Sequence, residues 1–256
     1  MNAFGRFLLF LISPLASASV GVDLNLVSDV EKITPGKPFI VGFHLQHHED
    51  FHSYWKSPGI VGVPTSLDWK LPKGFRAGEI QWPFPERSLM AGHPCHAYKR
   101  DVTLLVTITP PPILPEGKIT LSAEAQWMAC AQTCHPGFET FHISFPHVPA
   151  NGPELIQKAK KEIPKPDPDL AISLESDSDD KAVSILIAPQ DQKKAYFFST
   201  DGQVSSDHPQ VVTIEADGAL RLRMTRSEIS PKKCKSLPGV LQLGNRFIMI
   251  DPLYPE

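Results

Sequence analysis

Two cysteines, Cys130 and Cys134, are the residues of this chain whose type and spacing best support chemistry. Such a pair can form a disulfide that opens and closes, because a thiolate attacks a disulfide sulfur and exchanges one S–S bond for another. Two soft thiolates can also bind Cu(I). A third interpretation is a permanent bridge that only holds the fold together.

The spacing of the pair restricts the backbone that can carry a bond. A disulfide needs Cα atoms about 4.4–6.8 Å apart, whereas four residues of extended strand span ~13 Å. One helical turn advances only ~5.4 Å, so we expect Cys130 and Cys134 in a helical turn or a tight loop that ends at Pro136–Gly137. A bridge that closes so small a loop constrains little of the unfolded chain, which favours a redox role.

The surrounding motifs resemble a known family. The pair lies in the pattern Trp127-x-x-Cys130-x-x-x-Cys134-x-Pro-Gly, with the segments YWKSPG at 54–59 and GEIQWPFPER at 78–87 upstream. Together these resemble the periplasmic N-terminal region of the DsbD and ScsB group of thiol:disulfide interchange proteins. Segments 195–203 and 237–241 are similar to the second periplasmic module of that group.

This resemblance implies a function and partners. It implies that Cys130 and Cys134 both take part in exchange, as part of a thiol-disulfide oxidoreductase that needs no cofactor and no metal. The family receives electrons from a membrane domain and passes them to periplasmic thioredoxin-like proteins. We expect neither the membrane-spanning carrier nor the C-terminal thioredoxin-like domain in this chain, so we predict a separate membrane-embedded thiol reductase as its donor.

Further residues near the pair are candidates for tuning it. The family covers its cysteines with a loop that carries an aromatic residue, and Tyr54–Trp55 and Phe84 are the candidates here. Trp127 belongs either to this shield or to the core, where most large aromatic residues lie. His135 would favour the Cys134 thiolate if it were protonated. The sequence does not say which cysteine attacks.

Cys95 and Cys234 are the remaining cysteines. If Cys130 bonds Cys134, elimination leaves a structural disulfide between Cys95 and Cys234. Two independent thiols are the alternative.

Two other function classes stay open. The Cys-x-x-x-Cys-His-Pro sequence is also similar to the copper site of Sco-type chaperones, and histidines occur at 44, 47, 48, 52, 93 and 96. The thioredoxin-like context of that family is not evident, and most such histidines are solvated polar residues, so a copper-binding or copper-tolerance protein is the second hypothesis. A structural scaffold with a permanent disulfide is the third.

The N-terminus predicts export. Arg6, the apolar run 7–12 and the small residues 16–18 have the order of a secretory signal peptide with its cleavage site. We therefore expect a periplasmic protein, a compartment in which disulfides persist. No later run is long and apolar enough to cross a bilayer, and a net charge of −3 without a basic stripe argues against nucleic acid as a partner.

Composition and patterning predict the fold class. The 26 prolines, 16 glycines and many short alternating segments are typical of an all-β protein, here with two immunoglobulin-like β-sandwich domains. We expect a signal peptide at 1–18, a redox sandwich at 19–150, a helix and Pro-rich linker at 151–169, and a second sandwich at 170–256. The expected strands of the first sandwich are 22–28, 38–46, 65–71, 78–82, 102–109, 118–126 and 138–145. Those of the second are 170–175, 182–188, 195–199, 210–215, 219–224, 240–243 and 246–250, and the helix is 153–163.

Overall fold

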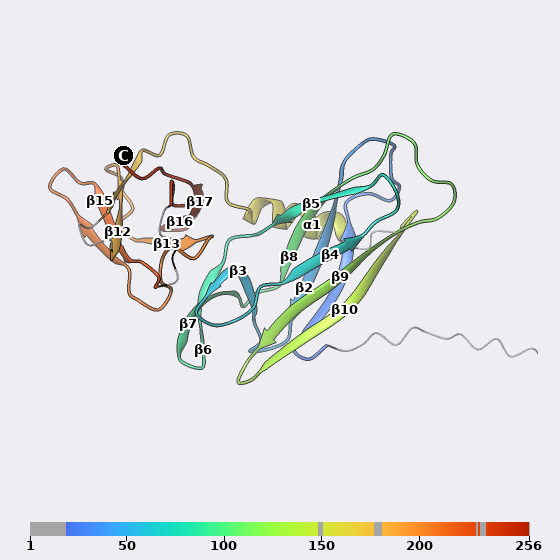
Figure 1. The fold of residues 1–256 in the computed structure, drawn as a ribbon, viewed down its shortest axis with the longest axis horizontal. Coiled ribbons are helices and arrows are strands. Elements are labelled where there is room, and N and C mark those ends of the chain that lie inside the picture. Colours follow the sequence, from blue (N-terminus) through green and yellow to red (C-terminus); the bar gives the residue numbers. More distant parts are fainter. Residues whose placement is uncertain (1–18, 148–150, 177–180, 229, 231–233, 256) are drawn as a thin grey trace, which may run out of the picture.

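The strands of this computed structural model form two lobes joined by a short helix (Figure 1). The structure describes residues 19–147, 151–176, 181–228, 230 and 234–255. The signal peptide expected at 1–18 lies outside the described residues. We call residues 22–145 the first lobe and residues 172–250 the second lobe. In the described ranges, no helix has the length and apolarity needed to cross a membrane.

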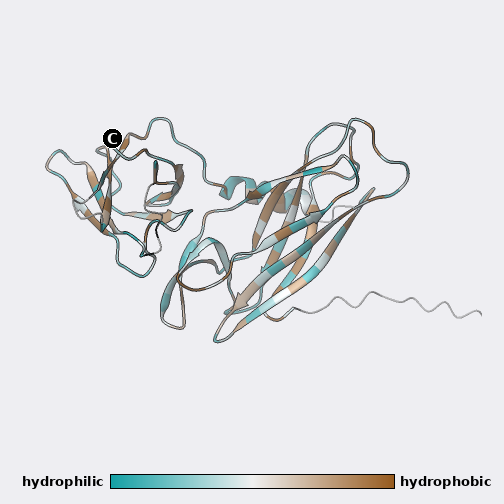
Figure 2. Ribbon diagram, viewed as in Figure 1, coloured by the Kyte–Doolittle hydropathy of each residue, from teal (hydrophilic) through white to brown (hydrophobic). Residues whose placement is uncertain are grey.

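The first lobe is a sandwich of two antiparallel sheets. One has the order β1-β2-β8-β5 and the other β10-β9-β4. Hydrophobic and hydrophilic residues alternate along β4 and β9 (Figure 2), as expected where one face is buried and the other is solvated, whereas β8 is buried on most of its residues. The bounds are β1 (Val22–Ser28), β2 (Phe39–His47), β4 (Ser66–Lys70), β5 (Arg76–Gln81), β8 (Val102–Thr109), β9 (Ile119–Cys130) and β10 (Cys134–Phe145). The expected immunoglobulin-like sandwich is therefore present.

A third sheet of the first lobe was not expected from the sequence. It has the order β3-β7-β6 and contains β3 (Ser53–Gly59), β6 (Glu86–Met90) and β7 (His93–Tyr98). The turn between β6 and β7 consists of Ala91 and Gly92, both at positive φ. Two-residue hairpin turns favour this geometry because its backbone twist matches the twist of the flanking strands. Alanine is unusual there, and Pro94 interrupts the strand pattern, so the hairpin carries no ordinary sequence signal.

The helix α1 (Gly152–Glu162) covers the outer face of the β1-β2-β8-β5 sheet. Ile156 and Ala159 are buried against Val27 and Leu105, with Leu155 and Ile163 beside them. Leu155, Ile156 and Ala159, with Ile163 directly after the helix, form the apolar face expected from the sequence, and the lysines of the helix lie elsewhere on it.

The second lobe is a smaller sandwich with its own core. Its sheets have the orders β11-β12-β15-β14 and β13-β16-β17, and apolar residues from both sheets fill the space between them. The bounds are β11 (Ile172–Ser176), β12 (Ala182–Ile187), β13 (Ala195–Ser199), β14 (Val211–Ile214), β15 (Leu220–Thr225), β16 (Gly239–Leu243) and β17 (Arg246–Ile250).

The two lobes contact each other through a buried polar and aromatic cluster. His96 of β7 is 5% exposed, and its Nε2 lies 3.1 Å from the Tyr196 hydroxyl of β13. Its Nδ1 lies 3.1 Å from the Ser57 carbonyl oxygen, so Nδ1 carries the proton and Tyr196 donates to Nε2. Phe198 packs edge-on against the same imidazole at 4.8 Å. Burial lowers the pKa of His96 from its usual 6.5 to about 4.

His96 should make the stability of the fold depend on pH. Its pKa is about 4 when folded and about 6.5 when unfolded, so the unfolded state binds more protons between these values. The free energy of unfolding should therefore fall as pH falls from 6.5 to 4, by about 3 kcal/mol from this residue. His96→Gln should remove that part of the slope in urea denaturation at a series of pH values. The exposed His142→Gln serves as control, and a wild-type slope in His96→Gln would refute the assignment.

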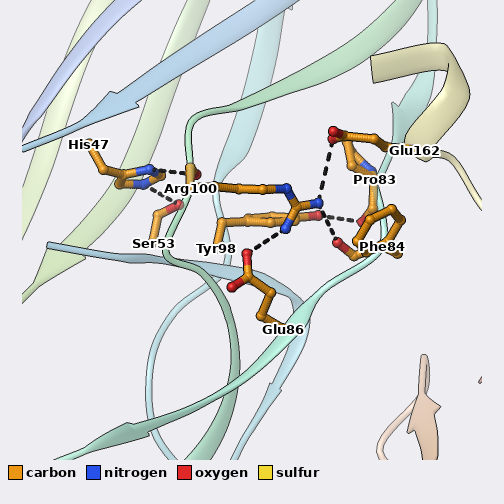
Figure 3. A network of polar contacts seen from close by, with 8 residues as sticks. All are labelled: His47, Ser53, Pro83, Phe84, Glu86, Tyr98, Arg100 and Glu162. Carbon is orange, nitrogen blue, oxygen red and sulfur yellow. Dashed lines mark hydrogen bonds and ion pairs between the residues drawn. The ribbon is translucent and has the colours of Figure 1, made fainter. Parts of the chain in front are cut away.

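A polar network centred on Arg100 connects the third sheet to the sandwich and to α1 (Figure 3). The Arg100 guanidinium binds Glu86 at 2.5 Å and Glu162 at 3.4 Å, and its backbone carbonyl accepts a hydrogen bond from His47 Nδ1 at 3.0 Å. His47 Nε2 in turn accepts from the Ser53 hydroxyl at 2.9 Å. Burial lowers the pKa of His47 to about 4, which keeps this imidazole neutral at pH 7. The network fixes the start of β3, the strand that faces the cysteine pair.

Candidate redox site

Cys130 and Cys134 form a disulfide at the end of a β-hairpin. Cys130 is the last residue of β9 and Cys134 the first of β10; the two are directly paired, with Cα atoms 4.1 Å apart. The expected bond is therefore present, and of the two expected backbones the tight loop is correct. The backbone N–H and C=O of Cys130 point away from β10 and both form hydrogen bonds with the backbone of His52. Cys130 and Cys134 are therefore a non-hydrogen-bonded pair of the β9–β10 ladder, which is the closer of the two antiparallel spacings.

The turn was expected to end at Pro136–Gly137, and this was wrong. Both residues lie inside β10, which begins at Cys134 rather than at Phe138. Because β10 is an edge strand, the missing N–H of Pro136 costs no ladder bond on its open side. Gly137 is required for another reason: a Cβ there would lie 2.2 Å from the Trp127 ring.

The two cysteines of the disulfide differ in exposure to solvent. Cys130 is 0% exposed, whereas Cys134 is exposed on the hairpin. Cys130 belongs to a small buried cluster with Tyr54, Cys95 and Ala97, which lies between the hairpin and the third sheet. The disulfide is therefore accessible from the Cys134 side and closed on the Cys130 side.

Tyr54 is the aromatic residue that contacts the disulfide. Its hydroxyl lies 3.1 Å from Cys130 Sγ, to which it donates, and 3.8 Å from Cys134 Sγ. The ring is 1% exposed, and burial, with a smaller effect from Cys95, raises its pKa to about 12. The hydroxyl thus keeps its proton at neutral pH and remains a hydrogen-bond donor to the buried sulfur. Its neighbour Trp55 is buried in the main core instead.

Phe84, the other candidate for a cover, lies elsewhere. Its ring stacks on Phe247 of the second lobe, with centroids 3.9 Å apart, and the central carbon of the Arg100 guanidinium lies 4.5 Å from the Phe84 ring centroid. Its backbone N–H donates to the Glu162 carbonyl. Phe84 therefore belongs to the contact between the lobes and to the Arg100 network.

Trp127 and His135 lie beside the pair in different roles. Trp127 is 5% exposed and packs in the core against Phe141 and beneath Gly137. His135 follows Cys134 and is half-buried; its Nε2 lies 3.0 Å from the Thr133 hydroxyl within the turn, and its ring lies 6.1 Å from that of Phe51. Trp127 thus supports the hairpin from within, while His135 contacts the turn itself.

Cys95 and Cys234 do not form the disulfide considered above: both are in the thiol form. The Cys95 side chain is buried in the first lobe, in the cluster of Tyr54, Ala97 and Cys130. It forms a hydrogen bond with the Ser88 side chain. Burial raises the pKa of Cys95, which favours the neutral thiol. Cys234 is partly exposed in the second lobe.

The histidines considered for copper do not converge. His44 bonds to Thr103, His47 to the Arg100 network, and His48 pairs with Asp23. Within the described ranges, no group of three or more His, Cys, Asp or Glu residues could hold a metal ion.

Comparison with known families bears on this site. Residues 25–145 match the family described as the N-terminal part of the thiol:disulfide interchange protein DsbD. The match spans the sandwich, the third sheet and both cysteines of the hairpin. This part of the chain belongs to the DsbD N-terminal family.

The fold of the whole chain also matches a solved structure. The N-terminal periplasmic domain of ScsB from Proteus mirabilis aligns with a TM-score of 0.71 and 13% identity, over 94% of this chain and 96% of that one. The similarity therefore extends through the second lobe and concerns the fold. Among curated proteins, none matches this sequence.

The sequence pointed to His52 only as one of the histidines considered for copper, and not as the residue that lies opposite Cys130. His52 exchanges two backbone hydrogen bonds of 2.9 Å with Cys130. The sequence did contain a signal for this position. His52 lies two residues before Tyr54, and alternate residues of a strand point to the same face, so a strand here would place both residues on one side. The strand β3 was itself not expected, so this alternation was not applied.

Proposed function

We propose that this chain carries out thiol–disulfide exchange with thioredoxin-like proteins through Cys130 and Cys134. One observation carries the proposal: a disulfide in which the residue Cys134 is exposed, while the residue Cys130 is fully buried and its sulfur accepts a hydrogen bond from the hydroxyl of Tyr54. A bridge between residues only four apart adds little to stability, and its asymmetry suits attack from one side. The DsbD N-terminal family match supports the same chemistry.

The reductive step follows from this asymmetry. A partner thiolate attacks Cys134 Sγ, the Cys130–Cys134 bond breaks, and its electron pair goes to Cys130 Sγ. The products are a mixed disulfide between Cys134 and the partner and a thiolate at Cys130. The Tyr54 hydroxyl, 3.1 Å from Cys130 Sγ, stabilises that charge as it develops. A second partner thiol then attacks the mixed disulfide and releases reduced Cys134.

The proposal includes a location and an arrangement of domains. We place the protein in the periplasm, exported by the segment 1–18, with a membrane-embedded thiol reductase as donor and thioredoxin-like proteins as acceptors. The similar ScsB structure is that of a periplasmic domain, which supports this placement. We take 19–150 as the redox domain and 170–256 as a second domain that docks or spaces, with the boundary in 151–169.

The reduction potential of the Cys130–Cys134 pair tests the proposal. Equilibration of the mature protein against dithiothreitol or glutathione, read by mass spectrometry, should give a value between about −120 and −270 mV, the range of exchange proteins. A value below about −300 mV, typical of structural disulfides, would contradict it.

Covalent trapping tests the partner class. Cys130→Ser, with Cys134 activated as a mixed disulfide with thionitrobenzoate, should form a covalent complex with a reduced thioredoxin-like protein whose second cysteine is serine. Cys134→Ser, activated in the same way, is the matched variant and should form little complex because Cys130 is buried. Equal trapping by the two variants, or none by either, would refute the proposal.

A further inference from the structure

His52 is a buried imidazole with an unused nitrogen beside the disulfide. The residue is 5% exposed, and its Nε2 is buried without a hydrogen-bond partner among the described residues. A buried nitrogen without a hydrogen-bond partner is unfavourable for the fold. By contrast, His44, His47 and His96 each have a hydrogen-bond partner for at least one ring nitrogen.

The backbone places this imidazole next to Cys130. His52 and Cys130 are directly opposite in an antiparallel bridge and exchange both backbone hydrogen bonds. Directly opposite residues of such a pair point to the same face, with Cβ atoms about 4.5–5.5 Å apart. Cys134 continues the row on the far side of Cys130. The His52 ring also contacts the Tyr54 ring edge-on at 5.2 Å, and the Tyr54 hydroxyl touches Cys130 Sγ.

A cavity connects His52 to solvent. A cleft of about 1210 Å³ between the lobes is lined by His52 together with Ala131 of the turn and Cys95. The imidazole can therefore lose a proton to water in this cleft even though Nε2 itself is buried, whereas the Cys130 residue has no exposed surface. The charged or titratable groups that interact with this imidazole or line the same cleft are Lys99, His47, Tyr54, Asp50, Glu86, Arg87, Cys95, Tyr196, Asp207 and His208.

We propose that His52 is the proton partner of the Cys130 sulfur when the disulfide closes. The inference rests on the exchange function proposed above. In this step Cys134 is held in a mixed disulfide with the partner. The Cys130 thiol gives its proton to His52 Nε2 and attacks Cys134 Sγ, so that the Cys130–Cys134 bond forms and the Cys134–partner bond breaks. The electron pair leaves on the partner sulfur, and the proton passes from His52 to water in the cleft.

Burial explains why such a partner is needed. A thiol enclosed by apolar groups resists ionisation, because a charge without a partner is costly there, yet only the thiolate attacks. Burial, with a smaller effect from Lys99, lowers the pKa of His52. The imidazole is therefore neutral at pH 7 and can accept a proton. The Tyr54 hydroxyl stabilises the same sulfur but, with a pKa near 12, remains a donor and cannot take the proton.

The closing step can be timed on its own. The reduced mature protein carrying Cys234→Ser is mixed with excess Ellman's reagent in a stopped-flow instrument. Cys134 should release one equivalent of thionitrobenzoate in a first phase that depends on reagent concentration. Attack by Cys130 should release a second in a unimolecular phase, and mass spectrometry of the product confirms the Cys130–Cys134 bond.

His52→Gln should slow the second phase at least about tenfold at pH 7, since positioned general bases contribute ~10²–10⁴-fold. It should also remove the imidazole inflection from the pH profile of that phase, and leave the first phase within about twofold. Imidazole added to His52→Ala should restore part of the rate through the cleft. The control is His44→Gln. His44 lies on β2 and forms a hydrogen bond with Thr103 of β8, so this variant should match the wild type.

The outcomes separate the two proposals. If the wild type never releases a second equivalent, the pair does not close and the exchange function fails together with the inference. If the wild type closes and His52→Gln closes at the same rate with the same pH profile, only the role of His52 is refuted. Slowing of both phases by His52→Gln without imidazole rescue of His52→Ala would make the residue merely structural and would also refute it.

Discussion

In the reduced native protein, Cys134 should be alkylated by iodoacetamide roughly a hundred times faster than Cys130. Cys134 is exposed on the hairpin and Cys130 has no exposed surface. A reagent reaches Cys130 only after local opening that breaks its two hydrogen bonds to His52 and its contacts with Tyr54. At about 0.5–1.5 kcal/mol for each hydrogen bond plus the lost packing, such opening costs about 3 kcal/mol, or a factor of about a hundred.

The other cysteine of the first lobe provides an internal reference. Cys95 is 1% exposed and lies in the same cluster, so it should react as slowly as Cys130. In denaturant all cysteines should react at similar rates, which shows that the native difference comes from the fold. Timed quenching followed by peptide mass spectrometry measures each site. Equal native rates for Cys130 and Cys134 would contradict the one-sided attack on which the exchange mechanism depends.

The sequence predicted the sandwich strands well because their signal is local. Strands such as β1, β8 and β17 alternate buried and exposed residues or consist of apolar runs, and their bounds match the expected ones within a few residues. The third sheet had no such signal. Its buried face is formed by Tyr54, Cys95 and Ala97 against Cys130, residues that come from three different strands. Only their contact in space makes that surface a core.

The candidate site was predicted in part for the same reason. Spacing and motif indicated a Cys130–Cys134 bond, but the Pro136–Gly137 pair was interpreted as the end of a turn. Proline is tolerated there because β10 is an edge strand, and glycine is needed because the Trp127 ring covers it. Neither the edge position nor that ring contact is a local property. The choice between Tyr54 and Phe84 as the residue over the sulfur likewise needed the tertiary structure.

Tyr54→Phe should slow reduction of the disulfide about tenfold while leaving the fold intact. The substitution removes only the hydroxyl that donates to Cys130 Sγ at 3.1 Å. Hydrogen bonds to charged groups are worth about 1.5–3 kcal/mol, and this one strengthens as Cys130 leaves as a thiolate. A loss of about 1.4 kcal/mol from the transition state corresponds to a tenfold lower rate. The measurement is the second-order rate constant for reduction by dithiothreitol at pH 7.

Tyr98→Phe is the matched control, because it also removes one buried tyrosine hydroxyl. That hydroxyl donates to the Pro83 carbonyl at 2.7 Å, away from the sulfurs. Both variants should lose a similar free energy of unfolding, about 1 kcal/mol, but only Tyr54→Phe should react slowly with dithiothreitol. Tyr54→Ala should go further, since removing a buried ring costs about 3–5 kcal/mol and opens the cluster around Cys130. If Tyr54→Phe and Tyr98→Phe are reduced at the same rate, the Tyr54 hydroxyl has no part in the exchange step and only packs against the pair.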